Sequence, residues 1–123
     1  MEDEKSKFKN DFKKRTYKWV LELIKQLERL PKDMTSDVIS RQLIRSATSV
    51  VANYIEASAA SSRKDFINFF TYSLKSANES KLWITLIIDT KKGSMQEFTS
   101  LLNELEEISK ILAKSILTLK NRK

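Results

Sequence analysis

Apolar residues recur along most of this chain at steps of three and four positions, the period of one face of an α-helix. The first such stretch runs from about Lys5 to Leu30. Pro31 ends this predicted helix because proline disfavours the helical conformation of the residue before it, and a short connection follows to Met34. The apolar positions of the helix are Phe8, Phe12, Trp19, Val20, Leu23, Leu27 and Leu30.

The second stretch predicts a helix that ends near Ala60. Thr35, Ser36 and Asp37 are residue types that favour helix N-caps, so we expect the helix to begin there. Its inward positions are Ile39, Leu43, Ala47, Val50, Tyr54 and Ala57, with Ile44, Val51 and Ile55 beside them.

The third predicted helix opens after Ser62, whose hydroxyl can accept hydrogen bonds from first-turn amides while Asp65 reaches back. Its inner positions are Phe66, Phe70, Ser73, Leu74, Ala77, Ile84 and Ile88. Lys81 falls among them, where a lysine fits only if its ammonium group reaches water. Gly93, the only glycine, is expected at the C′ position that closes this helix.

The fourth helix carries the clearest apolar stripe in the chain. Ser94 and Glu97 form a capping box that opens it. The stripe consists of Phe98, Leu101, Leu102, Leu105, Ile108, Leu112, Ile116 and Leu119.

Four helices of similar length joined by short connections predict an all-α fold, an antiparallel up-down-up-down four-helix bundle formed by one domain over residues 1–123. One glycine and one proline in the whole chain fit long uninterrupted helices and argue against a many-stranded β fold. An open array of helical hairpins is the alternative, but four matched stripes are buried best when the helices close on each other.

The composition removes several kinds of chemistry. The chain has no cysteine and no histidine, so disulfides, thiolate metal sites and histidine-based zinc, iron or acid–base sites are excluded. Glu104, Glu106 and Glu107 are the remaining metal candidates, and we interpret them as a solvated helix face. We therefore expect no cofactor and no enzymatic activity.

No apolar run approaches the roughly 20 residues that span a bilayer, and the first residues, Met1 to Glu4, are acidic. The sequence therefore predicts a soluble cytoplasmic protein without membrane contact.

The charge is unevenly distributed once neighbouring helices are given opposite directions. The net charge is +7, and the start of helix 1, the helix 2–3 connection and the end of helix 4 fall at one end. The basic residues at this end are Lys5, Lys7, Lys9, Lys13, Lys14, Arg15, Lys18, Arg63, Lys64, Lys110, Lys114, Lys120, Arg122 and Lys123. The acidic residues there are Glu2, Asp3, Glu4, Asp11, Glu56 and Asp65. The other end is close to neutral.

An end of the bundle with this excess of positive charge attracts anionic polymers such as nucleic acid. Lys7, Lys14, Lys18 and Lys25 also follow one outward line of helix 1 at helical spacing. The predicted nucleic-acid-binding residues are Lys7, Lys14, Lys18, Arg63, Lys64, Lys110 and Lys114. The alternative is that these side chains only cover a solvent face.

The outward face of helix 2 carries small and polar residues. Arg45 and Glu56 lie eleven residues apart, at almost the same angle on the helix, with Ser49, Ala52 and Asn53 between them. Small residues of this kind suit close packing of another backbone, so we predict a subunit interface with Arg45 and Glu56 as polar anchors.

Helix 3 supports the same prediction. Tyr72, Trp83 and Leu86 point away from its core positions, with Leu82 near the edge. A helix that is apolar on more than one face is usually buried on more than one face. Scattered exposed apolar side chains are the alternative.

Residues 42–56 (QLIRSATSVVANYIE) resemble a signature segment of a family of small bacterial four-helix bundles. That family includes proteins encoded within intervening sequences of 23S ribosomal RNA genes, often labelled ribosomal proteins, and the accessory variability determinant of diversity-generating retroelements. Residues 65–67 with 76–79, and residues 105–112, are similar to its second and third segments.

The resemblance implies a homo-oligomer, typically a five-membered ring (a pentamer), without catalytic activity. For the retroelement branch it implies contacts with nucleic acid and with a reverse transcriptase. The residues that match the family pattern are Arg45, Ser49, Asn53, Glu56 and Glu79, so Glu79 joins the predicted interface. Ala57 replaces the usual glycine, which is tolerated if the backbone there stays helical.

Three functional hypotheses follow. The first is an oligomeric accessory protein whose basic ends together bind structured RNA or DNA. The second is a scaffold for an acidic or reverse-transcriptase-like protein partner. An enzyme using an unforeseen lysine or carboxylate site ranks third, because no set of acid, base and oxyanion donor is visible.

Overall fold

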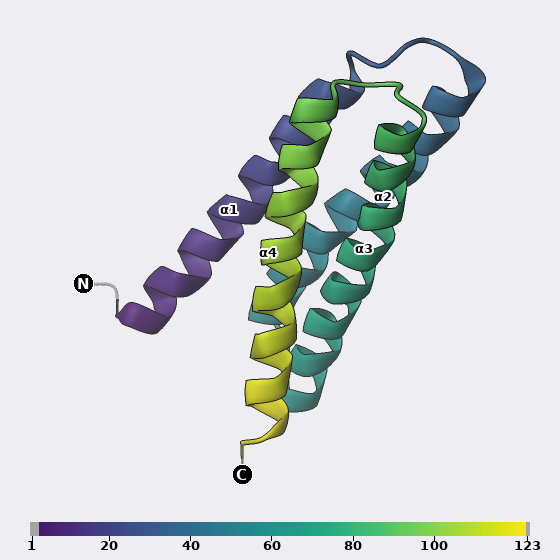
Figure 1. Ribbon diagram of the computed structural model, residues 1–123. Coiled ribbons are helices and arrows are strands. Elements are labelled where there is room, and N and C mark those ends of the chain that lie inside the picture. Colours follow the sequence, from purple (N-terminus) through teal and green to yellow (C-terminus); the bar gives the residue numbers. More distant parts are fainter. Residues whose placement is uncertain (1–2, 123) are drawn as a thin grey trace.

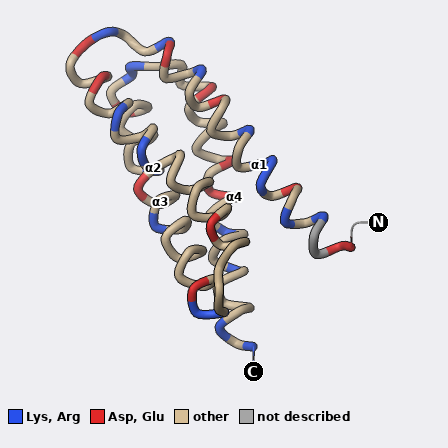
Figure 2. Tube along the Cα trace, turned by 180° about the vertical axis from the view of Figure 1, so that it is seen from behind, with Lys and Arg blue, Asp and Glu red and all other residues tan. Residues whose placement is uncertain are grey.

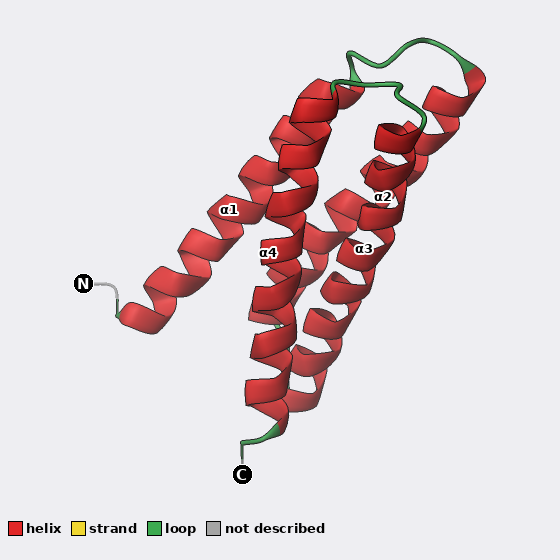
Figure 3. Cartoon of the chain, viewed as in Figure 1, coloured by secondary structure: helices red, strands yellow, loops and turns green. Residues whose placement is uncertain are grey.

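The computed structural model describes residues 3–122, which form four helices and no strand (Figure 3). They are α1 (Glu4–Leu27), α2 (Met34–Ser58), α3 (Arg63–Asp89) and α4 (Met95–Lys120). Consecutive helices run in opposite directions, and α4 returns beside α1 (Figure 1). The described part of the chain therefore has the predicted all-α up-down-up-down architecture.

The apolar stripes of all four helices meet in one core. Leu23 of α1, Leu43 of α2, Ile84 of α3 and Leu105 of α4 are completely inaccessible to solvent. Burial of a leucine or isoleucine side chain contributes about 1.5–3 kcal/mol, so these inward positions hold the bundle together.

Helices α2 and α3 form the tightest pair, because small side chains lie between them. Ser46, Ala47, Ser73 and Ala77 are buried at this contact. The Ser46 and Ser80 hydroxyl oxygens are 2.7 Å apart, and the Ser73 hydroxyl donates to the Val50 carbonyl oxygen at 2.7 Å. These bonds satisfy hydroxyl groups that would otherwise be costly to bury.

The buried side chains of α1 begin at Phe12, and the first turns of the helix diverge from α4 (Figure 1). The Trp19 indole nitrogen donates to the Leu101 carbonyl oxygen at 3.0 Å. The Arg15 guanidinium group makes two bonds of 2.7 Å to the Glu104 carboxylate. Between Lys7 and Arg15 only Phe12 is buried, so the start of α1 has a small contact area with the bundle.

The turn between α1 and α2 differs from the prediction. Helix α1 ends at Leu27, because the Arg29 and Leu30 amides bond only three residues back and tighten the chain. The N-cap of α2 is Asp33, whose carboxylate accepts from the Ser36 amide at 2.8 Å. Residues 35–37 therefore lie inside the first turn.

The Asp33 carboxylate also accepts a bond from the Lys92 ammonium group at 3.0 Å. The Ser36 amide and then Lys92 hold the pKa of Asp33 at about 2, because both favour the ionised carboxylate. This residue therefore joins the α1–α2 connection to the α3–α4 connection.

Gly93 does not occupy the predicted C′ position of α3. That position is Lys91, which has φ of 56°, while the Lys92 amide bonds to the Ile87 carbonyl and the Lys91 amide to the Ile88 carbonyl. Gly93 is needed for space instead, because a Cβ atom there would lie 2.4 Å from the Phe98 ring and 2.8 Å from Leu30.

The capping residues of α3 and α4 agree with the prediction. The Ser62 hydroxyl accepts from the Asp65 amide at 3.1 Å, and the Ser94 hydroxyl accepts from the Glu97 amide at 3.2 Å. The Asp65 side chain bonds to the Ser61 hydroxyl at 2.9 Å.

Candidate functional site

The start of α1, the α2–α3 connection and the end of α4 lie toward the same end of the bundle, as the helix directions predicted, although the start of α1 stands apart from the end of α4 (Figure 2). The Tyr54 hydroxyl of α2 donates to the Lys9 carbonyl oxygen of α1 at 3.2 Å. The Lys9 ammonium nitrogen lies 5.7 Å from the centre of the Phe66 ring of α3. We call this end, formed by the start of α1, the α2–α3 connection and the end of α4, the basic pole.

The end of α4 is joined to the start of α3 by Arg63. Its guanidinium group donates to the Leu119 carbonyl oxygen and, at 2.7 Å, to the Arg122 carbonyl oxygen. A cation here satisfies the unpaired carbonyl groups at the end of a helix and the negative end of its dipole.

The opposite end carries basic and acidic residues in equal number. They are Lys25, Arg29, Lys32, Arg41, Lys91 and Lys92, and Glu22, Glu28, Asp33, Asp37, Asp89 and Glu97. Three ion pairs, Lys25–Glu22, Arg41–Asp37 and Lys92–Asp33, form among them. Glu2 and Lys123, counted at the basic pole, lie outside the described residues.

A cleft of about 820 Å³ opens at the basic pole, where α1 diverges. Its apolar wall includes Phe8, Phe66, Phe70, Ile111 and Leu119. Its basic residues are Lys9, Arg63, Lys114 and Arg122. No carboxylate of the described residues lines it. We call it the aromatic cleft.

The predicted lysines Lys14 and Lys18 lie in a different hollow of about 730 Å³, between α1 and α4. This groove also contains five carboxylates, those of Asp11, Glu22, Glu97, Glu104 and Glu107. The Glu104 carboxylate raises the pKa of Arg15 through their hydrogen bonds. We call this hollow the mixed-charge groove, because its acids oppose the field of its lysines.

The other predicted binding residues also lie at different sites. Arg63 and Lys114 line the aromatic cleft, and Lys64 lies beside Arg63 in a shallow hollow that Lys120 also lines. Lys110 pairs with Glu107 at 3.5 Å, and Lys7 is exposed on the diverging part of α1.

Lys9 and Arg122 were absent from the predicted binding set, yet both line the aromatic cleft. Lys9 lies off the line of Lys7 and Lys14 along the helix, so a search by helical spacing passes over it. Its only sequence signal is its position near the start of α1.

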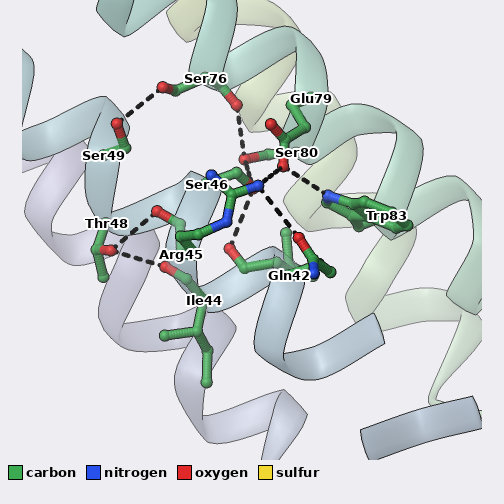
Figure 4. Close-up of polar contacts among 11 residues, drawn as sticks. Gln42, Ile44, Arg45, Ser46, Thr48, Ser49, Ser76, Glu79, Ser80 and Trp83 are labelled. Carbon is green, nitrogen blue, oxygen red and sulfur yellow. Dashed lines mark hydrogen bonds and ion pairs between the residues drawn. The ribbon is translucent and has the colours of Figure 1, made fainter. Parts of the chain in front are cut away.

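Two of the predicted interface residues of α2, Arg45 and Ser49, form a polar seam with α3 of the same chain (Figure 4). The Arg45 guanidinium group is 2.5 Å from the Glu79 carboxylate, which also accepts from the Trp83 indole nitrogen at 3.0 Å. The Ser76 hydroxyl donates to the Ser49 hydroxyl at 2.9 Å. The backbone that packs against Ser49 is therefore α3.

The remaining interface candidates differ in exposure. Trp83 and Leu86 are partly buried and pack against the core, whereas Tyr72 is 49% exposed. Asn53 bonds to the backbone and hydroxyl of Ser49 within α2. Glu56 is exposed and takes part in none of the ion pairs among residues 3–122.

The three carboxylates of α4 are each paired with a cation. Glu104 binds Arg15, Glu106 lies 3.4 Å from Lys81, and Glu107 lies 3.5 Å from Lys110. The Glu106 pair also explains Lys81, whose ammonium group reaches the surface beside α4. The described residues contain no cluster of acidic side chains suited to a metal ion.

With this geometry in view, the comparisons with known proteins agree with the resemblance. A family model described as "23S rRNA-intervening sequence protein" matches residues 9–114. The chain belongs to this family.

A solved structure supports the same assignment for this family member. It is a protein from the S23 ribosomal protein family of Bacteroides thetaiotaomicron, described as having unknown function. The two chains are 34% identical, the match covers 88% of this chain and 96% of the other, and the TM-score is 0.80. The comparison with curated proteins gives no match.

Two further features of this chain bear on the predictions. Ala57, which stands where the family usually has glycine, is buried and lies inside α2, so the backbone there stays helical. Among the helices formed by the described residues, none is both long and apolar enough to cross a membrane.

Proposed function

We propose that this protein is a non-enzymatic accessory protein that assembles with copies of itself and binds nucleic acid through the basic pole. The observation that carries the proposal is the set of cations around the aromatic cleft, Lys9, Arg63, Lys114 and Arg122, with no carboxylate among the lining residues. A phosphate backbone releases counterions when it meets such a surface, which favours binding.

Assembly strengthens this proposal. A single pole offers few phosphate contacts, and several poles on one ring bind one strand with an affinity that exceeds each by multivalency. The resemblance implies a pentamer, so a ring of five poles is the arrangement that we propose. A reverse transcriptase remains a proposed protein partner on the same basis.

The test is a fluorescence anisotropy titration with a structured RNA at increasing salt. We expect the logarithm of the binding constant to fall linearly with the logarithm of the salt concentration. Lys9→Gln with Lys114→Gln should weaken binding and reduce the slope by about 0.9 for each phosphate that the variant no longer neutralises.

The matched control is Lys14→Gln with Lys18→Gln, which removes the same charge from the mixed-charge groove. Carboxylates already oppose these lysines, so we expect a smaller decrease in affinity. Equal decreases from both pairs would mean that only net charge matters. Absence of binding at low salt would remove the proposal.

A further inference from the structure

The aromatic cleft exposes a ring that the bundle leaves unused. Phe8 is 54% exposed although it belongs to the apolar stripe of α1. Its ring lies parallel to that of Phe12, with centroids 6.3 Å apart and an interplanar angle of 2°. Because Phe8 is 54% exposed and lines the cleft, much of its ring is accessible to a ligand.

The deeper rings are already engaged with each other. Phe66 and Phe70 meet edge to face at 4.7 Å, and Tyr54 meets Phe12 in the same way at 4.8 Å. Lys9 lies over Phe66. These contacts fix the apolar wall of the cleft, and Phe8 is the exposed aromatic residue beside that wall.

The cations that line the cleft come from different segments. Lys9 comes from α1, Lys114 from α4, and Arg122 follows the end of α4. Neither Lys9 nor Lys114 takes part in an ion pair among residues 3–122. The cleft therefore combines a flat apolar surface with positive charge that no carboxylate of the described residues neutralises.

We infer that the aromatic cleft binds an unstacked base of a single-stranded nucleic acid, with the adjoining phosphates on Lys9, Lys114 and Arg122. This inference rests on the proposed function and names its substrate class. Single-stranded binding sites combine a basic surface with aromatic rings on which bases stack, and stacking is tolerant of sequence.

The same features argue against a duplex as the main ligand. In a duplex the bases stack on each other, and side chains reach only their edges and the phosphates. A duplex would leave Phe8 exposed and would use the cations alone. A loop or single strand uses both parts of the cleft.

The experiment compares labelled ligands of equal length, about twelve nucleotides, which lies within the range that one single-strand site covers. They are an unstructured oligo(dT), the same strand with abasic positions, and a duplex. Each is titrated with the full-length protein by anisotropy at low salt.

We expect oligo(dT) to bind about tenfold more tightly than the abasic strand, which keeps the phosphates and lacks the bases. Phe8→Ala should weaken oligo(dT) binding by about 5- to 150-fold, the range typical of removing one aromatic ring that stacks on a base. It should leave the abasic strand and the duplex unchanged.

Tyr17→Ala is the matched control. Tyr17 is 58% exposed on the same helix and is not among the residues that line the aromatic cleft. We expect it to bind all three ligands like the wild type. Circular dichroism of both variants confirms that α1 is retained.

Equal affinity for oligo(dT), abasic strand and duplex, unchanged by Phe8→Ala, would overturn this inference and leave the proposed function standing. Displacement of oligo(dT) and abasic strand alike by polyglutamate, with no effect of Phe8→Ala, would also overturn it, because the site would then recognise charge alone. Absence of binding to every nucleic acid would overturn both proposals.

Discussion

Single residues at the α3–α4 turn show that backbone conformation and available space are separate requirements. Lys91 has the left-handed conformation in which glycine is usual, and Gly93 has no positive φ. Gly93 instead leaves room for the Phe98 ring and Leu30. The two residues therefore respond in opposite ways to substitution.

Gly93→Ala is expected to lower the free energy of unfolding by about 1–3 kcal/mol, the usual cost of overpacking a core. The added methyl group would lie 2.4 Å from Phe98, so the ring must move. Urea denaturation measures the change. In a Phe98→Leu background, Gly93→Ala should lower the free energy of unfolding by less than it does in the wild type. An unchanged midpoint for Gly93→Ala in the wild type would show that the ring moves freely.

Lys91→Gly is expected to raise the free energy of unfolding by about 1 kcal/mol, because a left-handed conformation is strained for a residue with a Cβ atom. Thermal denaturation provides the measurement. Lys92→Gly is the control and should destabilise, since the Lys92 ammonium group lies 3.0 Å from the Asp33 carboxylate. Stabilisation by both variants would count against the strain at Lys91.

Tyr54 gives the protein an alkaline dependence of stability. Burial raises the pKa of its hydroxyl to about 12, whereas tyrosine in an unfolded chain ionises near pH 10. The neutral hydroxyl therefore stabilises the fold fully below about pH 10, and this contribution is lost as the pH rises toward 12.

Tyr54→Phe should remove that alkaline dependence and cost about 1 kcal/mol at neutral pH, for the hydrogen bond to the Lys9 carbonyl oxygen. The measurement is the urea midpoint of wild type and variant from about pH 8 to pH 12. Parallel profiles for the two proteins would contradict the assignment to Tyr54.

At the scale of helices, the α2–α3 contact distinguishes contacts within one chain from proposed contacts between subunits, which the sequence alone did not distinguish. Arg45 and Glu79 form an ion pair within one chain, with side-chain exposures of 62% and 35%. An exposed pair of this kind contributes at most about 1 kcal/mol. Because the Arg45 side chain is mostly exposed, its guanidinium group remains accessible to a second subunit.

Arg45→Glu is expected to lower the mass of the assembly to that of smaller species while changing the free energy of unfolding of the monomer by at most about 1 kcal/mol. Light scattering gives the mass, and circular dichroism gives the helix content. Arg41→Glu, which removes another exposed arginine of α2, is the control and should keep the assembly intact. An unchanged mass for Arg45→Glu would count against the subunit interface.

The helices themselves could be predicted because their apolar period and their capping residues Ser62 and Ser94 are local signals. The start of α2 could not, because Thr35, Ser36, Asp37 and Asp33 are all suitable caps. Asp33 is also held by Lys92, a contact between two connections that are distant in the sequence. Tertiary contacts thus decided between equivalent local signals.

At the scale of the molecule, the helices are unequally attached. Hydrogen exchange should reach its highest protection in the α2–α3 contact around Val50 and Ala77, which are fully buried, and its lowest in the first turns of α1. Mass spectrometry of exchanged peptides measures the difference. Equal protection of residues 7–14 and 47–54 would contradict the weak attachment of α1.

The basic pole could be predicted from the sequence, but the distribution of its basic residues between the aromatic cleft and the mixed-charge groove could not. Alternating helix directions are enough to bring the lysines of α1 together with those of α4. Whether Lys14 faces carboxylates and Lys114 faces an apolar wall depends on helix rotation and on the divergence of α1. Helical spacing alone predicts neither the rotation of the helices nor the divergence of α1. The absence of carboxylates from the described lining of the aromatic cleft is therefore visible only in the structure.

Both described ends of the chain lie at the same end of the bundle (Figure 1), which affects how the protein should be purified. A hexahistidine tag joined close to either described end would lie near the basic pole. The 123-residue sequence contains no histidine, so such a tag would introduce imidazole groups beside the lysines and arginines of this end, and their protonation below about pH 6.5 would change the local charge. Binding measurements should use protein from which the tag has been cleaved, or a fusion inserted at the opposite turns.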